Sequence, residues 1–312
     1  MRRPRRSTPA GQHRAVLLDQ VLAALDVRPG DTVVDCTTGW GGHACELLRR
    51  AGPTGRLLAL DLDAENLDRA RPRLEEVGHP FSLHHANFAG IAAVLGAQPA
   101  NAILADLGMA SMQVDDPGRG FSYAREGPLD MRMDRSRGRT ALELLKAIHV
   151  DELSAALREL GDEPEADKIA AAIVARRTKQ PLTGTRELAE LIQHAAPVQI
   201  VRGPGQPTPR QQQIRPAARV FQALRILVNR ELANLDHLLR ILPDVLAPGG
   251  RAAIISFHSG EDRRVKAAFR DGLRAGIYAA TSEEPLRAGF AERQANPRSR
   301  SAKLRWARRS AS

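Results

Sequence analysis

The sequence predicts an α/β fold with a doubly wound, mostly parallel sheet and an inserted helical domain. Short apolar runs alternate with amphipathic segments, a pattern typical of parallel strands joined by crossover helices. A glycine-rich loop follows the first apolar run, Thr32–Asp35. The stretch between the fourth and fifth runs is far longer than one crossover helix requires, so part of it is predicted to form a domain of its own.

Periodicity locates the individual elements. Apolar runs predict five strands, at Thr32–Asp35, Arg56–Asp61, Phe81–His85, Ala102–Asp106 and Arg251–Phe257. Apolar residues at helical spacing predict helices over 14–26, 42–50 and 64–75. They also predict one long helix from Pro216 to about Leu246, with the proline in the first turn, where its missing N–H would have no partner.

The surplus segment contains further helical patterns over 140–146, 151–160, 165–177 and 185–195. We therefore expect four parts in the chain. They are a disordered basic tail over 1–12, the first part of the main domain over 13–114, a helical substrate-recognition domain over 115–212, and the second part of the main domain, with a basic C-terminal tail, over 213–312.

Charge and composition narrow the function. The 312 residues carry a formal net charge of +10, and basic residues gather near both ends. Such a charge favours a polyanionic partner, although solvated tails are the plain alternative. No segment approaches the roughly 20 apolar residues that span a membrane, and no apolar segment follows the arginine-rich start as in a secretory signal. Cys36 and Cys45 show no metal-binding spacing, so we expect reduced core cysteines in a cytoplasmic protein and no metal site.

The most informative motif runs Asp35-Cys-Thr-Thr-Gly-Trp-Gly-Gly-His43 between a strand and a helix. Glycines allow a ligand to approach the backbone, and a helix N-terminus offers free N–H groups. Asp61 ends the next strand, where an acid can accept both ribose hydroxyls of an adenosine cofactor. This pair fits NAD as well as S-adenosylmethionine, whereas the missing G-x-x-x-x-G-K-[ST] pattern excludes a P-loop.

Three further motifs carry candidate functional residues. Asp106 ends the fourth strand, shortly before Gln113, and ligands of doubly wound sheets bind beyond the carboxyl ends of strands. The loop Gly120–Asp134 mixes aromatics, Met, Arg and acids without periodicity, which is typical of ligand loops. His258 follows the fifth strand and is a candidate for catalysis, with a structural hydrogen bond as the alternative. A Ser-His-Asp hydrolase would need a G-x-S-x-G elbow, which the chain lacks.

Several long stretches, in the right order, resemble the bacterial RsmH (MraW) methyltransferases, which methylate the N4 amine of a cytidine in small-subunit (16S) ribosomal RNA. The resemblance extends from His13 to Arg305. Its most specific stretches are Arg119–Tyr123, Gly127–Asp134, Phe221–Ile226, Ser256–Ser259 and Glu261–Arg263. It implies a seven-stranded S-adenosylmethionine methyltransferase sheet with an inserted helical domain, in a cytoplasmic enzyme whose partner is the small ribosomal subunit and its RNA.

The resemblance also implies roles for individual residues. Carried over by motif, the residues expected to bind the methyl donor are Gly41, Gly42, His43, Asp61, Phe88, Asp106 and Gln113. Asp61 would take the ribose, and Phe88 would flank the adenine. For the proton that leaves the amine, the candidate acceptors are, in order, Asp106, Ser111 and His258. A base in folded RNA must be exposed to react, and the residues expected to contact RNA are Phe121, Tyr123, Arg132, Arg298 and Arg300.

The chain departs from the family pattern at Trp40, Ala110, Arg215, Ala218 and Gly260. None of these positions is an expected donor contact, but several lie where RNA should enter, as in a divergent paralogue. Methylation of another RNA, a protein or a small molecule therefore stays open, as does a non-catalytic ribosome- or RNA-binding protein. The sequence also leaves open a homodimer and assistance by a metal.

Overall fold

The computed structural model describes residues 15–109, 111–203 and 206–311, apart from the side chains of residues 111 and 112. The chain forms two compact units. The sheet unit comprises residues 1–108 and 233–312, and the helical unit comprises residues 109–232. The inserted domain expected over 115–212 falls inside the helical unit, while the tail expected over 1–12 lies outside the described residues.

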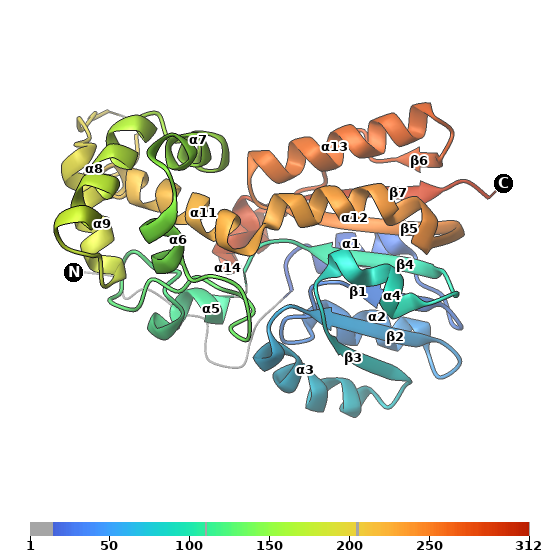
Figure 1. The fold of residues 1–312 in the computed structure, drawn as a ribbon. Coiled ribbons are helices and arrows are strands. Elements are labelled where there is room, and N and C mark those ends of the chain that lie inside the picture. The colour runs from blue at the N-terminus through green and yellow to red at the C-terminus, as the bar shows by residue number, and fades with distance from the viewer. Residues whose placement is uncertain (1–14, 110, 204–205, 312) are drawn as a thin grey trace. The chain divides into compact units, whose positions relative to one another are not determined.

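The sheet unit contains a seven-stranded sheet in the order β3-β2-β1-β4-β5-β7-β6 (Figure 1). Strands β1 to β5 are parallel to their neighbours in that group, and β7 runs antiparallel to both β5 and β6. The predicted doubly wound, mostly parallel α/β fold is therefore confirmed. The strands are β1 Thr32–Asp35, β2 Arg56–Asp61, β3 Phe81–His85, β4 Ala100–Asp106, β5 Leu246–Ser256, β6 Tyr278–Thr281 and β7 Lys303–Arg309.

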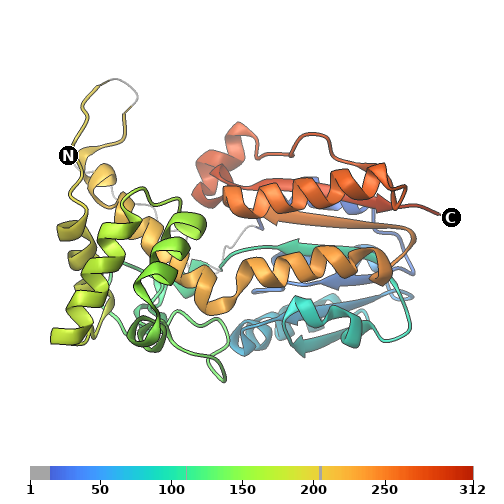
Figure 2. The same ribbon diagram turned by 45° about the horizontal axis from the view of Figure 1, so that its top comes forward.

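Helices pack on both faces of this sheet. Successive strand residues point to opposite faces, and two hydrophobic clusters divide them accordingly. Val33 and Leu104 pack with helices α1, α2 and α3, whereas Val34 and Ile103 pack with α4, α12 and α13, and Figures 1 and 2 show α12 and α13 side by side. The helices are α1 Leu18–Leu25, α2 Gly42–Ala51, α3 Ala64–Val77, α4 Ile91–Leu95, α12 Glu231–Val245, α13 Ser259–Arg274 and α14 Phe290–Ala295.

The helical unit has its own hydrophobic core. The apolar stripe expected in the sequence is buried there, with Ile169, Ala170 and Ile173 fully covered. Among the described helices of both units, none is long and apolar enough to cross a membrane. The helices of this unit are α5 Ser111–Asp115, α6 Ala141–Ala147, α7 Val150–Gly161, α8 Ala166–Lys179, α9 Thr185–Ala195, α10 Pro209–Gln213 and α11 Arg215–Asn229.

The segment between α5 and α6 is an irregular loop that folds closely upon itself. A Cβ atom at Gly120 would collide with the carbonyl oxygen of Pro128, and one at Gly127 would collide with that of Pro117. Glycine is therefore required at both positions. The Arg119 guanidinium closes the loop further, because it donates to the carbonyl oxygens of residues 132 and 133 at 3.2 and 2.9 Å.

The expectation of one long helix from Pro216 to about Leu246 is wrong. Two helices, α11 and α12, occupy this segment, and Arg230 between them adopts a left-handed conformation with φ of 52°. Leu246 already belongs to β5. The apolar spacing continues across the break, so periodicity could not reveal it. Arg225 and Glu231 bracket the break with two hydrogen bonds of 2.8 and 2.9 Å.

The expectation of a basic tail at the C-terminal end is wrong for residues 303–309. They form β7, which lies between β5 and β6 inside the sheet. Arg305 is only 4% exposed, and its Nε lies 2.7 Å from Asp262 Oδ1, while Lys303 Nζ lies 2.7 Å from Asp262 Oδ2. A buried arginine can be accommodated because a carboxylate on α13 meets it.

Candidate active site

Three acidic side chains gather at the carboxyl edge of the sheet. Asp35 ends β1, Asp61 ends β2 and Asp106 ends β4, and these three strands are neighbours. Parallel strands end at the same edge, so their last side chains are brought together. The charges of Asp106 and Asp61 both act to raise the pKa of Asp35. The structure thus brings Asp61 and Asp106 together, as expected, and adds Asp35 to them.

The glycine loop leaves β1 and turns back towards β2. Gly39 and Gly41 have φ of +52° and +81°, a region that favours glycine. A Cβ at Gly41 would meet Ala70 at 3.5 Å and one at Gly42 would meet Ala15 at 3.2 Å, whereas one at Gly39 would meet nothing closer than 4.0 Å. The sequence predicts Gly41 and Gly42 as the glycines that contact the ligand. In the structure, Gly39 is the one with open space beside its Cα atom.

Asp61 ties this loop to the start of α3. Its Oδ2 accepts a hydrogen bond from the Gly39 N–H at 2.7 Å, and its Oδ1 accepts from the Asp63 N–H at 2.8 Å and from Asn66 Nδ2 at 3.2 Å. The side chain is buried, and burial raises its pKa although these donors oppose the rise. Because Oδ2 has one donor in the described structure, it can accept a second hydrogen bond from a ligand hydroxyl.

His43 begins α2 and faces the acidic cluster. Its Nε2 lies 2.9 Å from the carbonyl oxygen of Val16, so Nε2 carries the proton and donates. In the neutral ring, Nδ1 is then unprotonated, and it lies 3.8 Å from Asp106 Oδ2. Burial lowers the pKa of His43, which favours this neutral ring. The imidazole therefore presents a lone pair, and no positive charge, to Asp106.

Burial raises the pKa of Asp35 to about 7 and that of Asp106 to about 7. Asp35 Oδ2 and Asp106 Oδ1 are buried and accept no hydrogen bond from any described residue. Such atoms are rare in proteins because desolvating them is costly, and they mark places where a ligand would supply the missing donor. The Thr37 hydroxyl joins the two strand ends, since it accepts from the Asp106 N–H at 2.6 Å. No motif in the sequence indicated this role of Thr37.

His258 lies after β5, at the same edge. Its buried Nε2 is 3.2 Å from Glu261 Oε1 but forms no hydrogen bond with any described residue. Glu261 Oε2 accepts from the Phe257 N–H at 2.8 Å and the His258 N–H at 3.3 Å, which closes the first turn of α13. His258 therefore stays a candidate for catalysis as well as for a structural role.

The other expected residues of the sheet unit lie close to the same edge. Phe88 begins the short 3-10 helix η1 (Phe88–Gly90) after β3 and packs against the core while half-buried. Arg298 and Arg300 lie in a second one, η3 (Pro297–Arg300), directly before β7. The positive charge of Arg298 acts to lower the pKa of Asp106, so its guanidinium lies within electrostatic reach of that carboxylate.

The remaining expected residues belong to the helical unit. Phe121 is 6% exposed and forms part of that unit's core, and Tyr123 packs edge-on against Phe221 with ring centroids 5.8 Å apart. Arg132 is paired with Asp130, at 2.6 Å from Nε and 3.0 Å from Nη2. Gln113 is buried. Residue 110 and the side chain of Ser111 lie outside the described residues.

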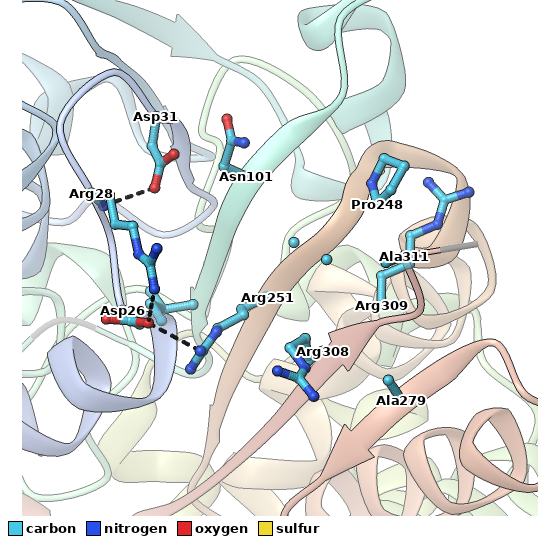
Figure 3. A pocket seen from close by; sticks show the side chains of 13 residues that line it. Asp26, Arg28, Asp31, Asn101, Pro248, Arg251, Ala279, Arg308, Arg309 and Ala311 are labelled. Carbon is cyan, nitrogen blue, oxygen red and sulfur yellow. Dashed lines mark hydrogen bonds and ion pairs between the residues drawn. The ribbon is translucent and has the colours of Figure 1, made fainter.

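A pocket of about 460 Å³ opens at the opposite, amino edge of the sheet (Figure 3). Arg28 and Arg251 share Asp26 there, at 3.3 and 3.0 Å. The Arg308 side chain forms no ion pair or hydrogen bond with described residues. Among those residues, no cluster of His, Cys, Asp and Glu could hold a metal ion at either edge.

Comparison with known proteins decides the family. The model of the MraW methylase family matches residues 10–310. The chain belongs to the MraW methylase family. This methylase is 42% identical to ribosomal RNA small subunit methyltransferase H 2 of Alkaliphilus metalliredigens over 96% of the chain and 86% of that protein. It is 43% identical to ribosomal RNA small subunit methyltransferase H of Symbiobacterium thermophilum, over 95% of the chain and 96% of that protein.

One departure of this methylase from the family pattern has a structural explanation. Trp40 packs beneath Arg69 of α3, whose guanidinium lies 4.7 Å from the ring centre. Arg73, also on α3, donates to the Trp40 carbonyl oxygen at 2.6 Å. Trp40 therefore fastens the glycine loop to α3. Nothing in the structure explains Arg215, Ala218 or Gly260.

Proposed function

We propose that this methylase uses S-adenosylmethionine to methylate the N4 amine of a cytidine in small-subunit ribosomal RNA. The names of its relatives support the class of substrate. The observation that carries the proposal is the cluster of Asp35, Asp61 and Asp106, with two buried carboxylate oxygens that accept no hydrogen bond from described residues. A methyl sulfonium is a cation, which such a cluster favours, whereas it would repel the pyrophosphate of NAD.

The residues that would hold the donor all follow carboxyl ends of strands. Asp61 Oδ2 has capacity for a ribose hydroxyl, Phe88 would flank the adenine, and the open face of Gly39 would admit the ligand to the backbone. Gly41, Gly42 and His43 would shape the loop from behind, and Gln113 is a further proposed donor contact. When bound, S-adenosylmethionine supplies an electrophilic methyl group, so positioning contributes much of the catalysis.

Asp106 is the proposed proton acceptor. The lone pair of the cytosine amine is delocalised into the ring, so a carboxylate that accepts a hydrogen bond from the N–H makes the nitrogen a better nucleophile and then takes the proton. Asp106 is suitable because it is a quarter exposed, ends a rigid strand and has a pKa of about 7. Ser111 and His258 are the second and third candidates for accepting this proton.

The RNA contacts are proposed from charge and exposure. Arg298 and Arg300 lie at the carboxyl edge and would bind phosphates. Tyr123 is half-buried and would stack on a base, as would Arg132 once it releases Asp130. Phe121 would support Tyr123 from the core, where its own ring lies, rather than contact the RNA.

The test is transfer of labelled methyl groups to small ribosomal subunits that lack the modification, followed by mass spectrometry of the nucleosides. We expect the label in N4-methylated cytidine. Label in another nucleoside or in ribosomal protein would refute the proposed target while leaving methyl transfer intact. Absence of heat on titration with S-adenosylmethionine, with RNA binding preserved, would refute the enzymatic function itself.

A further inference from the structure

Helix α14 exposes an aromatic side chain to solvent. Phe290 is 73% exposed, more than any other large apolar residue in the described part of the chain. Single exposed apolar residues are common on protein surfaces, so the interpretation of Phe290 depends on its position and on the residues near it.

Phe290 lies at the same edge as the acidic cluster. Helix α14 leads through η3 into β7, whose first residue, Lys303, pairs with Ser256, the last residue of β5. Glu292 Oε1 accepts from the Leu17 N–H at 2.8 Å, next to Val16, whose carbonyl oxygen binds His43. The charge of Glu292 also acts to raise the pKa of His43. Helix α14 is therefore fixed beside the glycine loop.

The surroundings of Phe290 are basic. Arg287, Arg293 and Arg300 are all exposed, and Arg300 Nε donates to the Arg293 carbonyl oxygen at 3.1 Å, which joins η3 to α14. Between residues 286 and 300 the only acid is Glu292, which is engaged with Leu17. An aromatic ring among arginines fits a single-stranded nucleic acid, because the ring stacks on a base while the guanidinium groups bind adjacent phosphates.

We propose that Phe290 is a stacking platform for an unpaired base of the RNA strand that enters the carboxyl edge, with Arg287, Arg293 and Arg300 on the neighbouring phosphates. This inference rests on the proposed function for the identity of the RNA. An apolar patch on a ribosomal protein is the competing partner. It is less favoured because the segment 286–300 offers one exposed aromatic ring together with three exposed arginines.

The experiment measures binding of the full-length protein to a fluorescein-labelled single-stranded RNA from the target region, and to the same RNA with abasic residues. Phe290→Ala should weaken binding of the intact RNA by about 5- to 20-fold, within the range known for base–aromatic stacking. Phe290→Leu should bind the intact RNA as weakly as Phe290→Ala, because leucine lacks a π face. Phe290→Trp should bind it with wild-type affinity. On abasic RNA the variants and the wild type should bind alike.

Leu273→Ala is the matched control. Leu273 is 41% exposed at the end of α13, ahead of β6 and away from the carboxyl edge, so its removal should leave RNA binding unchanged. Wild-type affinity in Phe290→Leu, or an equal loss on abasic RNA, would overturn the stacking role. Affinity for S-adenosylmethionine should be unaltered in every variant. If the wild type marks no cytidine while Phe290→Ala still loses RNA binding, the proposed target fails and the platform stands.

Discussion

The two edges of the sheet carry opposite charges in opposite settings. At the carboxyl edge Asp35 and Asp61 are buried, with Asp35 only 1% exposed, and Asp106 is a quarter exposed. At the amino edge arginines outnumber acids around the pocket, and the Arg28 side chain is 74% exposed. Burial raises the pKa values of the three acids. The comparison indicates that the sheet carries its energetically costly charges at the edge proposed to receive the methyl donor.

The buried acids of the carboxyl edge lower the stability of the folded protein, so packing alone does not account for them. A buried carboxylate oxygen without a hydrogen bond costs of the order of 1–3 kcal/mol, and the described structure holds one on Asp35 and one on Asp106. At the amino edge Asp26 meets two arginines, so no such cost arises. Replacing an aspartate by asparagine at each edge therefore tests whether the buried acids of the carboxyl edge matter for function.

The largest effect is expected for Asp106→Asn. The amide cannot accept a proton, so single-turnover methylation should fall by about 100- to 10,000-fold, with little change in affinity for S-adenosylmethionine. In the wild type the rate should rise with pH through about 7, because Asp106 accepts a proton only when ionised. Near-normal turnover in this variant, or a flat pH profile, would assign the proton to another residue.

A smaller effect is expected for Asp61→Asn. Its amide group would face the N–H donors of Gly39 or Asp63, so the glycine loop would lose its anchor and the donor its ribose partner. Affinity for S-adenosylmethionine, measured by calorimetry, should fall by about 10- to 150-fold. Asp26→Asn at the amino edge is the control and should bind the donor normally. Equal losses in the two variants would remove the distinction between the edges.

The third effect concerns stability rather than activity or binding. The pKa of Asp35 is raised on folding, so the folded state binds more protons than the unfolded state between about pH 4 and 7, and stability falls as pH rises across that window. Asp35→Asn removes this penalty. Its stabilisation should grow from pH 4, level off above about 7 and reach about 1–4 kcal/mol, as measured by denaturant unfolding. A change independent of pH would show that the ionisation of Asp35 carries no cost.

The parts of the fold that could be predicted are those whose signal is local. The strands β1 to β4 are apolar runs, and three of them end in an acid, so both the sheet and its acidic edge could be read from the chain. The glycine loop was located, but its open residue depends on packing against Ala15 and Ala70, which lie elsewhere in the sequence.

The wrong predictions arise where contacts or breaks in the chain leave no trace in the spacing of apolar residues. Strand β7 is rich in arginine, so its sequence predicts a solvated tail. The structure accommodates Arg305 inside the sheet because Asp262 pairs with it. Phe121 stands among polar loop residues, and only the collapse of that loop around Gly120 and Gly127 takes its ring into the core. The break at Arg230 interrupts a helical pattern whose apolar spacing is intact.

The position of β7 has a consequence for the order of assembly. Strand β6 comes earlier in the chain, yet in the sheet it neighbours only β7, so it joins the sheet only through β7. The ion pair between Arg305 and Asp262 joins residues 43 positions apart, a separation that slows closure. Until then the flank of β5 is an unprotected edge, available to any other extended chain. A nascent chain that has yet to emerge as far as β7 is therefore the stage most exposed to mispairing.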